Sequence, residues 1–282
     1  MKTTIMAICL LLTVCISANS KPINQLSIEE ERNHILSLAA MAYVYQDWQR
    51  KDISPSRGYN IGALLYDSKG DSIIAFERNS VNQYNDKTQH AEVRLMQGYM
   101  KKYSKPYLDG LQIITTLEPC MMCSGMMTFL MVDTTKYVQE DPEFGKNIER
   151  LAMPWTDPEG HVYQPNERCT RIKSILADYP GPSSDLNMAY KRYIKEKPQG
   201  SMSDFLYSEE AWNIYDFWVE VLELWSCVHV ENAKLLENIK SLLNKRTVHD
   251  SSPYGDKAFK KNIELLKITS KKKNIVLSGY KF

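Results

Sequence analysis

The segment TTLEPCMMCSGMM, residues Thr115–Met127, joins an apolar run of strand length to a run with the character of a buried helix. GLQIITTLEP (110–119) predicts the strand, and CMMCSGMMTFLMV (120–132) predicts the helix. Cys120 and Cys123 lie three residues apart, so the first turn of this helix can aim both sulfur atoms at one metal ion. The dipole and free amides of a helix N-terminus also favour thiolates. The segment therefore predicts a strand-to-helix connection that carries two metal ligands.

A second segment, TQHAEVRL (88–95), offers a third ligand and an acid. Zinc binds thiolates and imidazoles in tetrahedral geometry, and catalytic zinc sites keep one position open for water. His90 would supply the third protein ligand. Glu92 lies about 200° further round a regular helix, but the looser geometry of a helix N-terminus lets both side chains face one site. A carboxylate beside activated water can accept its proton and pass it on, so we expect Glu92 to be the catalytic acid–base residue.

Two other interpretations of the cysteine pair explain less of the sequence. A Cys-x-x-Cys motif can be a redox pair, but this leaves His90 and Glu92 without a role. A structural zinc site needs a fourth protein ligand, and the remaining candidates, His34 and His161, are far away in the sequence. The residue types favour a catalytic zinc site.

The order of the predicted elements up to residue 139 indicates an α/β fold. SIEEERNHILSLAAMAYVYQDWQRK (27–51) predicts a first helix, with Ser27 and Glu30 as a capping box. Its apolar residues at helical spacing would face a core: Ile35, Leu38, Ala39, Ala42 and Tyr45. Two strands joined by the turn SKGD follow (59–67 and 72–77), then a helix from His90 to Tyr103, the strand and buried helix above, and a strand at 135–139. Strands that alternate with helices favour a layered sheet.

The chain changes character after residue 146. Residues 146–185 contain many prolines and no clean period, and the pattern is helical from about Leu186. One stripe of large apolar residues predicts a helix packed on a core rather than a ligand site: Trp212, Tyr215, Val219, Leu222 and Trp225.

The motifs together resemble the zinc-dependent cytidine/deoxycytidylate deaminase superfamily, whose pattern H-x-E…P-C-x-x-C stands here as HAE and PCMMC. The resemblance is closest to the branch that holds tRNA adenosine deaminases and guanine deaminases. It extends to NIGALLYD, NDKTQHAEVRL, TTLEPCMMCSGMM and KYVQEDPEFG, in the family's order, over about residues 30–148.

This resemblance implies a fold, a cofactor and a set of site residues. The fold is a three-layer cytidine deaminase-like sheet with flanking helices. The cofactor is zinc, with His90, Cys120 and Cys123 as ligands and Glu92 as the proton shuttle. Three further residues are implied as substrate contacts: Asn79 in ERNSV, Asn60 near the mouth of the site, and Asp141 in a loop that closes over it. Related deaminases associate as dimers or larger assemblies, so a homo-oligomer is expected.

The N-terminus indicates export. MKTTIMAICLLLTVCISANSK has a lysine, a short apolar run and then small or polar residues, the order of a secretory signal peptide. We expect cleavage near Ser20 and a secreted or periplasmic protein with no permanent membrane span. In an oxidising compartment Cys169 and Cys227 would either form a disulfide or remain two separate thiols, and the sequence does not choose between them.

The charge of the chain gives little indication of its partners. Formal net charge is +1 over 282 residues, so no overall basic field indicates nucleic-acid binding. The C-terminal tail, however, carries eight lysines against Glu264: Lys257, Lys260, Lys261, Lys267, Lys271, Lys272, Lys273 and Lys281. It is either a solvated terminus or a contact for phosphates or anionic lipid, and through it nucleic acid becomes a candidate partner.

These observations divide the chain into a signal peptide (1–20), a zinc domain (27–148) and a mainly helical C-terminal extension with a lysine-rich tail (149–282). We expect an exported zinc-dependent hydrolase that removes an exocyclic amine from a nucleobase, nucleoside or nucleotide and releases ammonia. Two alternatives stay open. One is a secreted effector-type deaminase that acts on nucleic acid, and the other is an inactive zinc-binding interaction protein.

Overall fold

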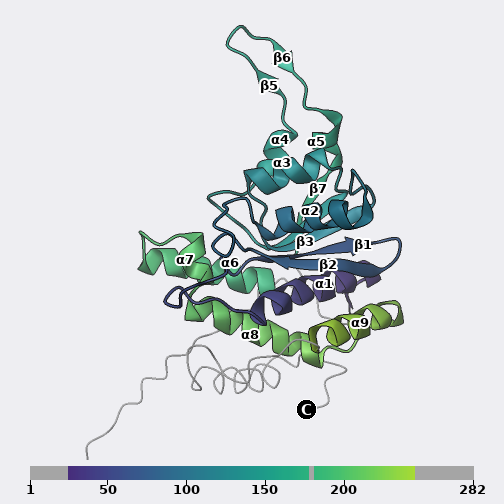
Figure 1. The fold of residues 1–282 in the computed structure, drawn as a ribbon, viewed down its shortest axis with the longest axis vertical. Helices are drawn as coiled ribbons and strands as arrows, with labels where there is room; N and C mark the ends of the chain where they lie inside the picture. Colours follow the sequence, from purple (N-terminus) through teal and green to yellow (C-terminus); the bar gives the residue numbers. More distant parts are fainter. Residues whose placement is uncertain (1–24, 178–180, 245–282) are drawn as a thin grey trace, which may run out of the picture.

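A five-stranded mixed sheet forms the centre of the molecule (Figure 1). A computed structural model describes residues 25–177 and 181–244. The strands lie in the order β2-β1-β3-β4-β7. Their bounds are β1 Gly62–Asp67, β2 Ser72–Arg78, β3 Leu111–Leu117, β4 Thr134–Gln139 and β7 Lys173–Leu176. β1 is antiparallel to both β2 and β3, whereas β3, β4 and β7 are parallel. Strands and helices therefore form the layered α/β architecture that the sequence predicts.

Two helices cover one face of the sheet and begin at the predicted metal ligands. α2 (Ala91–Tyr103) and α3 (Met121–Phe129) lie above the sheet in Figure 1. Between them and the strands lies a continuous apolar core that includes Ile113, Leu95, Met96 and Met127. Burying this apolar surface fixes both helices on the sheet, and so fixes the residues at their N-termini.

The opposite face of the sheet is covered by α1 (Ile28–Tyr45), which begins at the predicted capping box of Ser27 and Glu30. α1 is buried on nearly all sides: Ile35, Leu38 and Val44 are 0% exposed. Residues 34–45 of α1 are all buried, and a helix that is buried all round needs neighbours on both sides. The sheet covers one side, and the second side is covered by helices that follow residue 180.

These later helices are α6 (Pro182–Glu196), α7 (Met202–Leu206), α8 (Glu209–Leu224) and α9 (Ala233–Asn244). α8 lies along α1 on the side away from the sheet (Figure 1). All five residues of the predicted apolar stripe, from Trp212 to Trp225, belong to the core between these helices, α1 and the sheet. The stripe is thus a packing surface, as its spacing predicts.

Residues 146–177 differ from the sequence prediction, which assigned no strand to them. They form α4 (Asn147–Leu151), a projecting hairpin of β5 (Trp155–Thr156) and β6 (Val162–Tyr163), α5 (Glu167–Arg171) and then β7. β7 pairs with β4 from Thr134↔Lys173 to Tyr137↔Leu176. The region predicted as a helical extension therefore supplies the fifth strand of the sheet.

Several predicted features fall on parts of the chain that lie outside the described residues. These are the signal peptide (1–20) and the lysine-rich tail from Lys257. No helix within residues 25–177 and 181–244 has the length and apolar composition needed to cross a membrane. Cys169 and Cys227 are both free thiols. Cys169 lies on α5 and Cys227 follows α8. The two helices α5 and α8 lie on opposite sides of the sheet (Figure 1).

Candidate metal centre and active site

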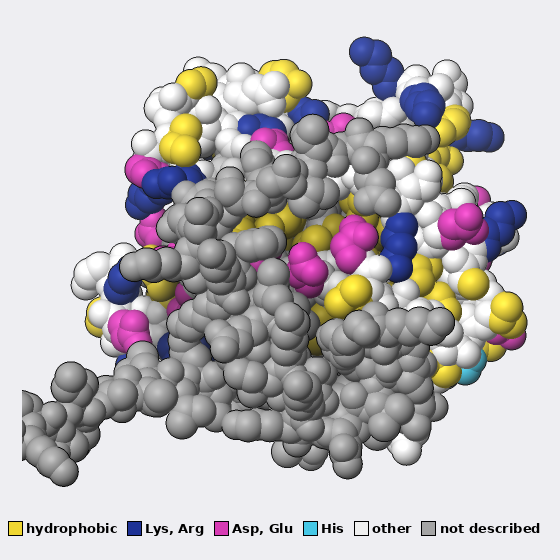
Figure 2. Space-filling model, turned by 90° about the horizontal axis from the view of Figure 1, so that it is seen from below, with side chains coloured by type: hydrophobic (Ala, Val, Ile, Leu, Met, Phe, Trp, Pro, Cys, Tyr) yellow, Lys and Arg dark blue, Asp and Glu magenta, His cyan; other side chains and the backbone are white. Residues whose placement is uncertain are grey.

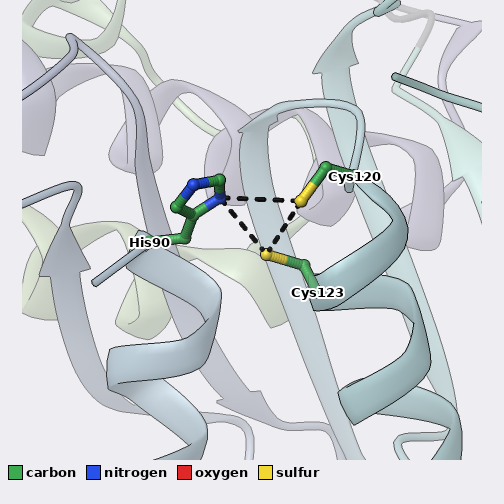
Figure 3. Close-up of side chains that lie close together, drawn as sticks. All are labelled: His90, Cys120 and Cys123. Atoms are coloured by element: carbon green, nitrogen blue, oxygen red, sulfur yellow. Dashed lines mark hydrogen bonds between the residues drawn. The ribbon is translucent and has the colours of Figure 1, made fainter. Parts of the chain in front are cut away.

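The three predicted ligands meet where two helices begin. His90 is the N-cap residue of α2 and Cys120 is the N-cap residue of α3, while Cys123 lies in the first turn of α3. Neither N-cap side chain bonds the backbone amides of its own helix. The imidazole and both sulfur atoms instead point toward one another (Figure 3).

The spacing of these donor atoms fits a zinc ion. The distances His90 Nδ1–Cys120 Sγ, His90 Nδ1–Cys123 Sγ and Cys120 Sγ–Cys123 Sγ are all 3.6 Å. Tetrahedral zinc with usual bond lengths places two sulfur ligands about 3.8 Å apart and a nitrogen and a sulfur ligand about 3.6 Å apart. Two thiols and one imidazole are also the ligand types that zinc prefers. The residues present therefore fit the zinc cofactor that the sequence predicts, with three protein ligands.

The charges of this cluster fit a cation as well. Hydrogen bonds with Cys123 and with His90 lower the pKa of the Cys120 thiol to about 4. The hydrogen bond with Cys120, burial and the nearby Glu92 raise the pKa of the Cys123 thiol well above its usual value. A second thiolate in this buried place therefore needs positive charge beside it, which a bound zinc ion supplies.

Glu92 lies in the first turn of α2 and faces the same cluster. It is 3% exposed. Its Oε2 accepts from the Cys123 thiol (3.6 Å), and its Oε1 accepts from Thr115 Oγ1 (3.1 Å). Burial raises the pKa of its carboxyl group. Such a carboxyl holds a proton more readily than an exposed one, which suits acid–base chemistry near neutral pH.

Thr115 of β3 is a site residue that the sequence reasoning missed. Its hydroxyl lies between Glu92 Oε1 and the carbonyl oxygen of Gly62 (3.3 Å) on β1. A hydroxyl has one proton to donate, so Thr115 connects the position of Glu92 to the start of β1. Only the pairing of β1 with β3 reveals this connection, because nothing local in the sequence marks it.

Glu118 is a second residue that the sequence reasoning missed. It is 3% exposed and lies two residues before Cys120. Its carboxylate accepts from the backbone N–H groups of Asp141 (3.0 Å) and Lys146 (3.1 Å). The segment LEP (117–119), directly before the cysteine pair, is the local sequence signal that could have identified Glu118. Glu118 thus anchors the loop 140–146 beside the metal cluster.

The three predicted substrate contacts have different environments. Asn79 is fully buried, and its Oδ1 accepts from the backbone N–H groups of Tyr59 (3.2 Å) and Val81 (3.4 Å). Among the described residues its Nδ2 has no hydrogen-bond partner, and a buried donor without a partner calls for an explanation, of which contact with a ligand is one. Ser80 N donates to Gln89 O (2.9 Å), so this segment lies next to His90.

Asn60 and Asp141 have structural hydrogen bonds. Asn60 Nδ2 donates to the carbonyl oxygens of Gln49 (2.7 Å) and Leu206 (3.0 Å). Asp141 Oδ1 accepts from the N–H groups of Glu143 and Phe144, both at 3.0 Å, and so closes its own turn. The geometry gives both residues a role in holding loops, and their contact with substrate stays a prediction.

A mixed α/β sheet with a partly buried His-Cys-Cys cluster and an adjacent buried carboxyl defines a class of zinc-binding hydrolytic domain. Residues 37–139 match the family model of the cytidine and deoxycytidylate deaminase zinc-binding region. Residues 37–139 are therefore assigned as a cytidine and deoxycytidylate deaminase zinc-binding region, which contains His90, Glu92, Cys120 and Cys123.

Similar proteins agree with this assignment over part of their length. The chain is 29% identical to a tRNA-specific adenosine deaminase of Agrobacterium fabrum over 132 residues, which are 46% of this chain and 80% of that protein. It is 31% identical to a tRNA-specific adenosine deaminase of Aquifex aeolicus over 85 residues. The second match covers 30% of this chain and 55% of the Aquifex protein, so the chain spans only about half of that relative.

Solved structures of deaminases are also similar to this chain. One comes from a study of tRNA:A34 deaminases, with 25% identity and a TM-score of 0.36, and the match covers 51% of this chain and 98% of that chain. A guanine deaminase from Nitrosomonas europaea has 18% identity and a TM-score of 0.36, and the match covers 54% of this chain and 78% of that one.

Proposed function

We propose that this chain is a zinc-dependent hydrolase that replaces an exocyclic amine of a nucleobase ring by oxygen and releases ammonia. The observation that carries the proposal is the geometry of four side chains. His90 Nδ1 and the sulfur atoms of Cys120 and Cys123 lie 3.6 Å apart, and the buried carboxyl of Glu92 contacts Cys123. Three protein ligands leave one position of tetrahedral zinc for water. Bound zinc would act as a Lewis acid that makes water a better nucleophile at neutral pH.

Glu92 supplies the proton transfers of this reaction. A water molecule adds to the ring carbon that carries the amine, and Oε2 of Glu92 takes up the proton that the water loses. Glu92 then donates that proton to the adjacent ring nitrogen. The second water proton reaches the amine, also through Glu92, the carbon–nitrogen bond breaks, and ammonia leaves as the ring carbonyl forms. Its raised pKa lets this carboxyl act as acid and as base in turn.

The proposed substrate class is a purine or pyrimidine with an exocyclic amine. The similarity to proteins named tRNA-specific adenosine deaminase supports an adenine-type ring, either free or within RNA. The unpaired Nδ2 of Asn79 is a donor for a ring nitrogen or carbonyl. The buried, hydrogen-bonded Glu92 supports an active enzyme over an inactive zinc-binding protein, because metal binding alone does not require this acid.

An ammonia-release screen over bases, nucleosides, nucleotides and single-stranded oligoribonucleotides tests the proposal. We expect release from at least one of these classes, and loss of release in Glu92→Gln with zinc content unchanged. Glu159→Gln, on the exposed turn of the β5–β6 hairpin, is the matched control and should keep wild-type release. Equal release by wild type and Glu92→Gln would remove Glu92 from the mechanism, and no release from any class would reject the function.

We also propose that the protein is exported, on the strength of residues 1–20 alone. A reporter fused to residues 1–25 should be exported, whereas the same fusion with Leu11→Lys and Leu12→Lys in the apolar run should stay inside the cell. Retention of the unaltered fusion inside the cell would contradict export and leave the proposed chemistry untouched.

A further inference from the structure

The C-terminal helices reach back to the segment that precedes β1. Tyr207, at the C-terminus of α7, donates through its hydroxyl to the carbonyl oxygen of Gly58 (2.9 Å). The carbonyl oxygen of Leu206 accepts from Asn60 Nδ2 (3.0 Å). Leu206, the last residue of α7, and Tyr207, its C-cap, therefore hold the segment 57–62 at two points, across about 150 residues of sequence.

The first half of this segment is fixed to Asn79. Tyr59 N donates to Asn79 Oδ1 (3.2 Å), and Arg57 Nη1 donates to the carbonyl oxygen of Asn79. Gly58 leaves no room for a side chain, because a Cβ atom there would lie 2.4 Å from Asn79 Oδ1. A shift of the segment 57–59 would therefore move Asn79, the residue whose buried Nδ2 is unpaired.

The second half of the segment is connected to Glu92. Gly62 N donates to Thr116 Oγ1 (3.1 Å), and Gly62 O lies 3.3 Å from Thr115 Oγ1. The same Thr115 hydroxyl contacts Glu92 Oε1 (3.1 Å). The segment 57–62 thus contacts both sides of the candidate active site, while the end of α7 contacts the back of the segment.

We propose that α7 is part of the active-site architecture and that Tyr207 is a positioning residue. Tyr207 and Leu206 fix the segment 57–62, and this segment in turn fixes Asn79 and Thr115. The inference rests on the proposed function, because it assigns Asn79 to the substrate side of that site. It also gives a role to part of the C-terminal region, outside the stretch that resembles deaminases.

Tyr207→Phe tests this proposal, because it removes the hydroxyl and keeps the ring. Tyr193→Phe is the matched control: Tyr193 on α6 packs against Phe205 of α7, and its hydroxyl makes no hydrogen bond within residues 25–177 and 181–244. Hydrogen–deuterium exchange of a peptide that covers residues 56–62 reports the position of the segment without any need for activity. We expect faster exchange there in Tyr207→Phe alone, with exchange in α9 and zinc content unchanged.

The kinetic consequence should fall on KM rather than on kcat. Losing one hydrogen bond changes an equilibrium by about 2- to 10-fold, so we expect KM to rise by about that factor in Tyr207→Phe, with kcat within about twofold. Asn60→Ala should have the same effect to a larger degree.

Unchanged exchange at residues 56–62 in Tyr207→Phe would overturn the proposal, as would a KM equal to that of Tyr193→Phe. Absence of ammonia release in the wild-type protein would instead reject the proposed function, and the exchange measurement would still decide whether Tyr207 holds the segment.

Discussion

At Gly145, the loop 140–146 beside the metal cluster has no space for a side chain. A Cβ atom there would lie 2.3 Å from Glu118 Oε2 and 2.4 Å from the carbonyl oxygen of Asp141. Backbone cannot yield as a flexible side chain can, so Gly145→Ala must displace the loop 140–146. We expect a loss of stability of about 1–3 kcal/mol, as for other overpacked sites, measured by urea unfolding.

Gly98→Ala is the control for this prediction. Gly98 lies inside α2, and a Cβ atom there has no neighbouring atom within 4 Å. Because alanine is the better helix former by about 1 kcal/mol, Gly98→Ala should be more stable than wild type. A change of the same sign in the free energy of unfolding for both variants would contradict the steric account of Gly145.

At this residue scale, the sequence predicts the site through two short motifs. HAE and PCMMC identify His90, Glu92, Cys120 and Cys123, because zinc chemistry limits the ligand types and their spacing. Thr115 and Glu118 are not predictable in this way. Their roles depend on partners such as Gly62 and Lys146, which the sheet and the loop bring near.

At the scale of elements, the packing of α8 against α1 determines whether the core between α1, the C-terminal helices and the sheet forms. Trp212 on α8 is 1% exposed, and its ring centre lies 5.9 Å from that of Tyr45 on α1. Trp212→Ala should destabilise the protein by about 3–5 kcal/mol, the usual loss for a large buried aromatic side chain. Urea unfolding would measure this loss in the free energy of unfolding.

Leu242→Ala is the matched control, because Leu242 is 43% exposed on α9. Its truncation should change stability by about 0.5 kcal/mol or less, as is usual for a surface position. A loss for Trp212→Ala no larger than that for Leu242→Ala would show that α8 is not essential to the core.

The elements up to Gln139 are predictable from their periodicity, within a few residues at each end. The α1 capping box and the β1–β2 hairpin are found where the sequence places them. β7 is not predictable: it has four residues, its burial alternates only weakly, and no apolar run marks it. Its place in the sheet comes from parallel pairing with β4, a long-range contact.

At the scale of the whole molecule, the deaminase domain and the C-terminal helices share one core. Ile114 and Leu64 of the sheet, α1 and Trp218 belong to the same apolar cluster. A chain cut after residue 148 loses β7 and the cover of α1, so we expect it to be insoluble or unfolded. A chain cut after residue 244 keeps every described element and should unfold cooperatively. Circular dichroism and size-exclusion chromatography would check both, and a folded 1–148 chain would contradict the shared core.

The charge distribution bears on the nucleic-acid alternative. Figure 2 shows the lower face of the molecule, where the described acidic side chains lie beside hydrophobic ones. That visible part of the face has no continuous basic surface among its described residues. The lysine-rich tail, which lies outside the described residues, stays a candidate contact for nucleic acid on the evidence of the sequence alone, and the oligonucleotides of the activity screen address it.

The central claim is that His90, Cys120 and Cys123 hold a zinc ion that the deamination requires. The most direct measurement adds zinc stepwise to metal-free protein and follows ammonia release from the best substrate of the screen. We predict that the rate rises in proportion to zinc and levels off at about one ion per chain, whereas Cys123→Ala shows no such rise. Full activity of the metal-free protein, or a rate independent of added zinc, would contradict the account.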